Sequence, residues 1–242
     1  DILYDLDEVM DSVGIPLIGV VPEDMNIKIC GAKGEPLPPN CGGAKAYAAI
    51  HQEAKDNIRE LMGVPENYSI LFLQGGASTQ FSMVPMNLLT EGKVADYTNS
   101  GTWANKAIKE AKKVGKVNIV ADCQKEIPTR VPSMDELKLT PDAAYLHITT
   151  NETISGAQWK EIPNVACPIV ADMSSDILSR PIDVSKFGLI YAGAQKNLGP
   201  SGLTLVIVRE DLIGNAMDIT PTMFNYQIHA DNASLYNTPP TY

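Results

Sequence analysis

The residue with the clearest chemical potential is Lys196, in the stretch FGLIYAGAQKNLGPSG that covers residues 187–202. An apolar run, 189–192, precedes it and a second run, 203–208, follows it, so the sequence predicts two buried strands with this lysine between them. We expect a lysine in such a place to be desolvated, and a desolvated amine forms Schiff bases with carbonyl compounds. An ordinary loop lysine is the alternative, and it is the commoner one for an isolated lysine.

A glycine-rich turn could bind an anion. Residues 68–73, YSILFL, are predicted to form a strand that leads into the turn QGGASTQ, residues 74–80, and the apolar segment 81–89 is predicted to be a helix. A strand, a glycine-rich turn and a helix together present backbone N–H groups to an anion, and Ser78 adds a hydroxyl. Glycine turns join strands to helices in many proteins, so this feature alone has low specificity.

A carboxylate and an indole complete the set. Asp172 ends the apolar segment PIVAD, and Trp103 follows a glycine-containing turn at the start of a predicted helix. Taken singly, Asp172 could be a helix cap and Trp103 a core aromatic. Together with Lys196 and the anion-binding turn they supply what pyridoxal 5'-phosphate needs: a phosphate cup, a flat surface, an anion for the ring nitrogen and an amine for the aldehyde. The constellation therefore predicts a site for this cofactor.

The elements that must position these groups alternate between strand and helix patterns. The predicted helices are 44–62, 81–89 and 103–114, and the predicted strands are 68–73, 94–97, 116–121, 143–149, 168–172, 189–192 and 203–208. This alternation predicts an α/β fold, a three-layer αβα arrangement with a mostly parallel sheet. Because ligands bind beyond the carboxyl ends of such strands, the candidate residues should meet at one edge.

The composition limits the functions to consider. The chain has 242 residues, 44% of them hydrophobic, which is enough to bury the core of one large domain or two small ones. A net charge of −10 argues against nucleic acid or an anionic membrane as a partner, and no apolar segment has the length of a membrane span. Four cysteines without CxxC spacing are expected to be reduced, which predicts a cytoplasmic protein. Scattered histidines, His51, His147 and His229, predict no metal site.

Residues 46–242 resemble the phosphoserine aminotransferases, which are class V, fold-type I pyridoxal-phosphate enzymes. The matching stretches are long and collinear: LFLQGGASTQFSMVPMNLL, NSGTWANKAIKEAKKVG, HITTNETISG, VADMSSDILSRPIDVSKFGLIYAGAQKNLGPSGLTLVIVRED and SLYNTPPTY. The resemblance implies the large domain of a fold-type I transferase. It also implies amino transfer between L-glutamate and 3-phosphohydroxypyruvate, which gives O-phospho-L-serine in serine biosynthesis, in two half-reactions through a pyridoxamine form.

The resemblance assigns the catalytic roles to two residues. Lys196 corresponds to the Schiff-base lysine, and Asp172 to the carboxylate that faces the pyridine nitrogen. Two more positions match residues that contact the cofactor ring: Trp103 stacks on it, and Thr153 lies near its 3-oxygen. If the resemblance were set aside, Thr153 could be an ordinary turn residue.

The family's phosphate-binding positions are also present. Ala77, Ser78 and Gln195 match residues that bind the phosphate of the cofactor. Asn237 and Thr238 match residues that reach the phosphate in the neighbouring subunit, although they could also belong to a plain loop. The resemblance therefore implies a homodimer with shared active sites, acting on small-molecule substrates.

The first 45 residues have a different resemblance. The pattern GIPLIGVVPED, then KGEPL, then AKAYAAI is similar to the C-terminal part of MinD, the bacterial division-site ATPase. This predicts two domains, 1–45 and 46–242, with a helix at 1–12 and a strand at 15–21 in the first. The G-x-x-x-x-G-K-[ST] loop of such an ATPase is absent from the sequence, so the resemblance carries no ATPase activity.

Two departures from the aminotransferase pattern bear on activity. Residues 40–44, NCGGA, stand where the family has a His-Arg pair whose arginine binds the substrate carboxylate. The chain also ends at NTPPTY, before the family's small C-terminal domain. Because arginine binds carboxylate and phosphate through two parallel hydrogen bonds, we expect weaker affinity for both anionic substrates. The alternative is a truncated or chimeric, non-catalytic protein that at most binds pyridoxal phosphate.

Overall fold

The structure, a computed structural model, describes residues 42–126 and 129–236. It divides into two compact units, 1–60 and 61–242, and the described part of the first unit belongs to helix α3 (Gly42–Met62). The helix and strand expected within residues 1–21 lie outside the described residues, as do Asn237 and Thr238.

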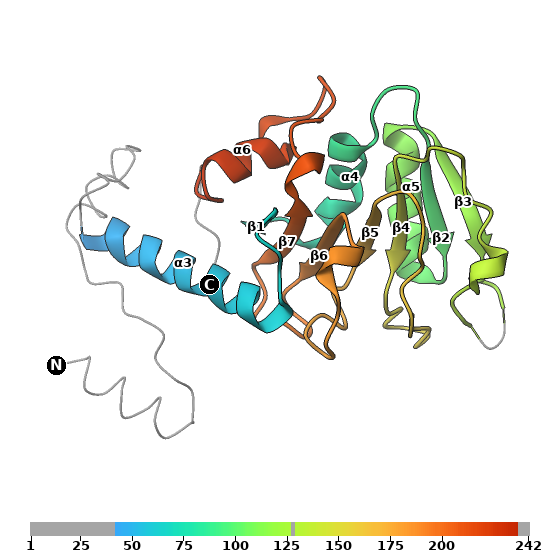
Figure 1. Cartoon of the computed structure of the whole chain (residues 1–242), viewed down its shortest axis with the longest axis horizontal. Coiled ribbons are helices and arrows are strands. Elements are labelled where there is room, and N and C mark those ends of the chain that lie inside the picture. The colour runs from blue at the N-terminus through green and yellow to red at the C-terminus, as the bar shows by residue number, and fades with distance from the viewer. Residues whose placement is uncertain (1–41, 127–128, 237–242) are drawn as a thin grey trace. The chain divides into compact units, whose positions relative to one another are not determined.

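A seven-stranded sheet runs through the second unit (Figure 1). Its order is β1-β7-β6-β5-β4-β2-β3, and β7 alone is antiparallel to its neighbours, so β1 to β6 all point the same way. The α/β fold with a mostly parallel sheet is therefore confirmed. The strands are β1 (Tyr68–Leu73), β2 (Ala95–Asn99), β3 (Val117–Asp122), β4 (Tyr145–Thr149), β5 (Ile169–Asp172), β6 (Leu189–Gly193) and β7 (Thr204–Arg209).

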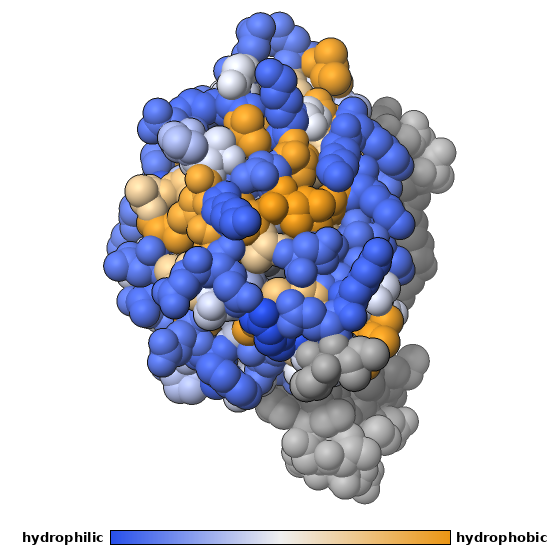
Figure 2. All heavy atoms as spheres, turned by 90° about the vertical axis from the view of Figure 1, so that its right-hand side faces the viewer, coloured by the Kyte–Doolittle hydropathy of each residue, from blue (hydrophilic) through white to orange (hydrophobic). Residues whose placement is uncertain are grey.

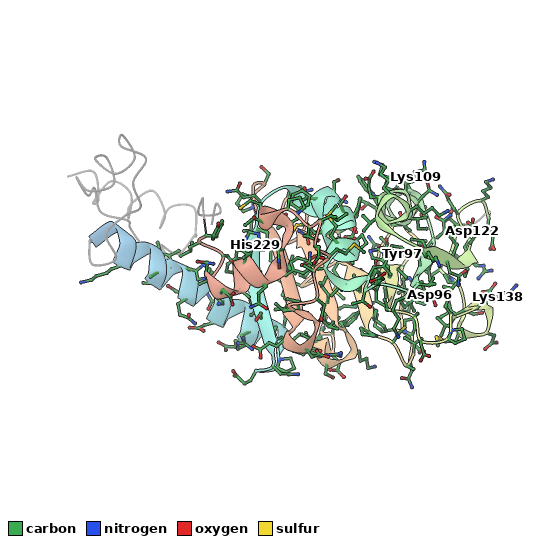
Figure 3. All side chains as sticks on the ribbon, turned by 90° about the horizontal axis from the view of Figure 1, so that it is seen from above. Asp96, Tyr97, Lys109, Asp122, Lys138 and His229 are labelled. Atoms are coloured by element: carbon green, nitrogen blue, oxygen red, sulfur yellow. The ribbon has the colours of Figure 1, made fainter. Side chains whose placement is uncertain are left out.

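Two long helices pack on one face of this sheet. Phe81 of α4 (Gly76–Leu88) and Ile108 of α5 (Thr102–Val114) share a core cluster with Tyr97 of β2 and Tyr191 of β6. Successive residues of β2 alternate between faces, so Tyr97 points toward α5 and Asp96 points away from it (Figure 3). The remaining helical elements are short: η1 (Met134–Glu136), η2 (Val184–Lys186), η3 (Glu210–Leu212), η4 (Thr222–Phe224) and α6 (Tyr226–Asp231).

The first turns of α4 differ from the sequence prediction. A helix was expected to begin at Phe81, with residues 74–80 as a turn, but α4 begins at Gly76. Gln74 and Gly75 alone connect β1 to α4, and Gly75 and Gly76 have positive φ values of 92° and 70° that suit glycine. The polar residues that follow these glycines therefore belong to the helix, and they lie at its N-terminal end.

The edge strand β3 is shielded by the segment that follows it. Lys138 donates its backbone N–H to the carbonyl of Val120 at 3.0 Å, which covers part of the open edge. Figure 2 views this end of the sheet and shows a largely hydrophilic surface with several apolar areas, the broadest across its upper middle. Within residues 42–126 and 129–236, no helix has the length and apolar character needed to cross a membrane. The same residues contain no cluster of His, Cys, Asp and Glu side chains suited to a metal ion.

Candidate active site

A single pocket collects the residues that follow five codirectional strands. Because β1, β2, β4, β5 and β6 point the same way, their carboxyl ends share one edge of the sheet. Every predicted site residue within the described chain lines this pocket: Ala77, Ser78, Trp103, Thr153, Asp172, Gln195 and Lys196. The structure thus brings together groups that lie as much as 119 positions apart in the sequence, from Ala77 to Lys196.

Lys196 lies in the connection that follows β6. Its Nζ donates a hydrogen bond to Thr153 Oγ1 at 2.7 Å and lies 5.0 Å from the centroid of the Trp103 ring. The prediction of a desolvated lysine is wrong for this structure, because the Lys196 side chain is exposed. The cause is local: β6 ends at Gly193, so Lys196 lies beyond the edge of the sheet rather than between two strands.

Asp172 is the last residue of β5 and is buried, with 5% of its surface exposed. Its Oδ1 accepts hydrogen bonds from the Ser174 backbone N–H at 3.0 Å and the Ser174 hydroxyl at 2.7 Å. Burial raises the pKa of Asp172, and the Ser174 hydrogen bonds and the charge of Lys196 oppose that rise. Within the described residues no hydrogen bond reaches Oδ2, so this oxygen can accept one from a ligand in the pocket.

The N-terminal end of α4 forms an anion-binding corner of the pocket. Its cap residue, Gly75, makes no side-chain capping bond, and the first backbone N–H groups of a helix have no intrahelical acceptor. Ala77 and Ser78 carry two of these N–H groups, and the helix dipole adds partial positive charge there. Gly193 approaches closely: a Cβ on it would lie 2.8 Å from Gln195 Oε1 and 3.5 Å from the Ala77 nitrogen.

Aromatic side chains form a buried floor next to Asp172. Tyr191 is paired with Asp172 across β5 and β6, and its hydroxyl lies 2.9 Å from His147 Nε2. His147 stacks on Tyr97 with ring centroids 4.7 Å apart, and Tyr97 contacts the Tyr145 hydroxyl at 2.9 Å. Burial lowers the pKa of His147 to about 3, so this ring is neutral at physiological pH. The floor is therefore uncharged beside the carboxylate.

Several pocket residues were not predicted individually as site residues, although Gly76 belongs to the predicted anion-binding turn. They are Gly76, Phe81, Thr149, Asn151, Ser174 and Ser175. Two pocket atoms are buried without a hydrogen-bond partner in the described part of the chain, Thr149 Oγ1 and Trp103 Nε1. The signal that could have found Thr149 and Asn151 is their place at the end of a strand in a parallel sheet. Ser174 could have been found from its spacing, since Asp-x-Ser favours a local side-chain hydrogen bond.

Comparison with known proteins gives consistent matches. Residues 42–242 match the aminotransferase class-V family. The phosphoserine aminotransferase of Geobacillus kaustophilus (strain HTA426) is 57% identical over 199 residues, 82% of this chain and 55% of that relative. The chain thus spans about half the length of this curated relative.

Solved structures agree with the sequence comparison. The phosphoserine aminotransferase from Bacillus circulans subsp. alkalophilus is 54% identical with a TM-score of 0.77, covering 80% of this chain and 54% of that one. The pyridoxal-phosphate-bound phosphoserine aminotransferase from Trichomonas vaginalis is 38% identical with a TM-score of 0.78, covering 93% of this chain and 65% of that one.

Proposed function

We propose that this chain, which belongs to the class-V aminotransferase family, binds pyridoxal 5'-phosphate. It carries the reactive half of a phosphoserine aminotransferase site. One observation carries the proposal. The lysine, the carboxylate, the indole and the helix N-terminus that the cofactor requires all line one pocket. Three known relatives with this name or cofactor support it further.

The residues present fit the cofactor chemically. Asp172 Oδ2 is an acceptor without a partner in the described chain, as a protonated ring nitrogen would need. Trp103 supplies a flat apolar surface, and the first turn of α4 supplies N–H donors for a phosphate. When bound, pyridoxal phosphate supplies an aldehyde that condenses with amines and a ring that withdraws electrons.

The chain's own groups then have separate tasks. Lys196 Nζ is the amine that holds the cofactor, and it also takes and returns the α-proton of the amino-acid substrate. Thr153 Oγ1 orients this amine through the hydrogen bond at 2.7 Å. Asp172 keeps the ring nitrogen protonated, while Ser174 holds the carboxylate in place. Trp103 covers the ring and excludes water from one side of it.

We assign the phosphate to Ala77, Ser78 and Gln195. For Asn237 and Thr238, which lie outside the described residues, we propose contact with the phosphate in a second copy of the chain. This makes the assembly a homodimer with shared sites, in the cytoplasm. The domain division at residues 45 and 46, with a MinD-like first segment, is likewise a proposal.

For the substrates we propose L-glutamate as amino donor and 3-phosphohydroxypyruvate as acceptor. The support for these substrates is the name of the relatives, phosphoserine aminotransferase, because Lys196 and the N-terminus of α4 are already assigned to the cofactor. The alternative function is binding of pyridoxal phosphate without turnover, which residues 40–44 favour because they contain no arginine. Steady-state transfer of the amino group from glutamate by the purified chain separates these alternatives: turnover excludes the binding-only function.

The cofactor assignment is tested by absorbance titration with pyridoxal phosphate. A visible band that is lost on sodium borohydride treatment, with a covalent label on Lys196 by peptide mass spectrometry, is the expected result. Lys196→Ala should abolish the band. Lys109→Ala is the matched control, because Lys109 extends from α5 to the outside of the molecule (Figure 3). A full band in Lys196→Ala, or a label spread over surface lysines, would refute the assignment.

A further inference from the structure

Glu152 is a fully buried carboxylate beside the pocket, and none of the roles above uses it. Its exposed fraction is 0%, and it stands between Asn151 and Thr153, which both line the pocket. A carboxylate that is removed from water requires hydrogen-bond donors. Glu152 receives them from the backbone: Oε2 accepts from Trp103 N at 3.0 Å, and Oε1 accepts from Ala104 N at 2.9 Å.

The beginning of α5 is built to receive this carboxylate. Gly101, the cap residue of α5, makes no side-chain capping bond, so Glu152 supplies the cap from the segment that follows β4. A Cβ on Gly101 would lie 2.5 Å from Glu152 Cδ and 2.6 Å from Oε2. The backbone of Gly101 is extended, with φ of 171°, and any residue can adopt it. Space for the carboxylate, rather than backbone conformation, therefore excludes a larger residue.

The two hydrogen bonds from Trp103 N and Ala104 N to Glu152, here called the clasp, hold two sides of the pocket together. On one side it holds the backbone of Trp103, and this sets the position of an indole whose centroid is 5.0 Å from Lys196 Nζ. On the other side Glu152 is joined covalently to Thr153, whose hydroxyl accepts from the same Nζ at 2.7 Å. A shift of Glu152 would therefore move the aromatic surface and the lysine's partner relative to each other.

We propose that Glu152 is a positioning residue that sets the Trp103 indole and the Thr153 hydroxyl at the spacing a planar cofactor ring requires above Lys196. The identity of that ring as pyridoxal phosphate rests on the proposed function. Glu152 does not touch the ring and acts through Trp103 and Thr153. Its carboxylate is suited to this task, because each of its two acceptor oxygens binds one of two adjacent backbone N–H groups.

The first test replaces Glu152 by an isosteric amide. Glu152→Gln keeps the volume but loses one acceptor oxygen, so Trp103 N or Ala104 N loses its partner. We expect about tenfold weaker binding of pyridoxal phosphate, because the indole and the Thr153 hydroxyl would lose their spacing, whereas the lost hydrogen bond itself lies within the protein and acts on stability. We also expect a smaller visible circular dichroism of the bound cofactor at saturation, because this signal reports the ring's fixed orientation.

Asp176→Asn is the matched control for loss of a buried acid. Asp176 is 9% exposed and accepts from the Thr150 hydroxyl at 2.5 Å, and within the described residues no hydrogen bond joins its side chain to Trp103 or Thr153. It should lower the thermal midpoint and leave the affinity and visible circular dichroism unchanged. Equal loss of both signals in Asp176→Asn and Glu152→Gln would show that Glu152 is only structural, and would overturn the inference.

A double-variant cycle tests the contact itself. Gly101→Ala alone should weaken cofactor binding to a similar extent, because the added methyl displaces the Glu152 carboxylate. In a Glu152→Ala background the same change meets no carboxylate and should cost nothing further. Losses that simply add in the double variant would contradict a shared action.

A ligand-free measurement separates this inference from the proposed function. The chain has two tryptophans, so Trp159→Phe leaves the fluorescence of Trp103 alone. In that background Glu152→Gln should make Trp103 more accessible to acrylamide quenching. Failure of the unaltered chain to take up pyridoxal phosphate would refute the proposed function, and the quenching comparison would still decide the inference. Unchanged quenching and unchanged cofactor binding in Glu152→Gln would overturn the inference and leave the proposed function intact.

Discussion

Ser174→Ala should destabilise the chain in a pH-dependent way. The Ser174 hydroxyl donates to Asp172 Oδ1 at 2.7 Å and accepts from Gly193 N at 3.1 Å, and both partners are buried. Losing a hydrogen bond to a charged group costs about 1.5–3 kcal/mol, and a buried N–H without a partner costs about 1–3 kcal/mol. Because the two effects share one site and are not strictly additive, we expect a total of about 2–4 kcal/mol. This corresponds to a fall in Tm of about 5–12 °C for a domain of this size.

The pH dependence follows from the raised pKa of Asp172. Burial raises this pKa in the folded chain above the ordinary value of 3.8, and the Ser174 hydrogen bonds partly offset the rise. When the pKa of an acid is higher in the folded chain than in the unfolded chain, the folded chain binds more protons. The free energy of unfolding therefore falls as pH increases above the unfolded pKa. Ser174→Ala raises the pKa further, so the stability gap between variant and parent should widen from about pH 4 to about pH 7.

The sequence contains a matched control for this experiment. Asp183 accepts from Ser185 N at 3.0 Å and from the Ser185 hydroxyl at 2.5 Å, in the same Asp-x-Ser arrangement. Both of these residues are exposed, so Ser185→Ala should change Tm little. The assay is thermal unfolding of the ligand-free chain followed by far-ultraviolet circular dichroism at the two pH values. Equal effects of Ser174→Ala and Ser185→Ala, or a gap that does not vary with pH, would refute the argument.

Three other outcomes follow from the same structure. Gly188→Ala should lower stability by about 1–3 kcal/mol through overpacking, since its Cβ would lie 2.7 Å from Pro168 Cβ, while cofactor absorbance at saturation stays unchanged. Gly193→Ala should instead weaken pyridoxal-phosphate binding in absorbance titrations, because its Cβ would lie 2.8 Å from Gln195 Oε1. Burial lowers the folded pKa of His147 to about 3, below its ordinary value of 6.5, so its stabilising contribution is present above that value and is lost as pH falls. Urea denaturation should therefore show a decline in stability below about pH 6.5 that is reduced in His147→Gln.

The sequence predicted the helices and strands better than it predicted which residues of different elements contact one another. Each of the seven strands predicted between residues 68 and 208 overlaps an observed strand, because long apolar runs bounded by turn residues are strong local signals. The start of α4 was misplaced because a glycine pair marks a turn without showing how soon a helix follows. The short helix α6 was missed, since six residues give too little periodicity to detect.

Contacts between residues that are distant in the sequence were also not predicted in the pocket. Residues that match a family motif could be named one at a time, and the described ones meet in a single pocket. The clasp of Glu152 could not be foreseen, because its partners Trp103 and Ala104 lie almost 50 positions earlier in the sequence. Gly101 was visible as a turn residue, but the reason for it is a carboxylate from the segment that follows β4. Packing against a distant group leaves no local pattern in the sequence.

The antiparallel pairing of β6 and β7 could have been predicted from the sequence, and it explains the exposure of Lys196. Only residues 194–203 separate β6 from β7, and a parallel crossover needs about a dozen residues or more, usually with a helix. The short, glycine- and proline-containing connection therefore requires β7 to return antiparallel, as observed. A lysine in such a connection must stand outside the sheet, at the edge where the codirectional strands end. The chain length between the two apolar runs thus places the amine in the pocket, and desolvation by flanking strands is not needed to bring it there.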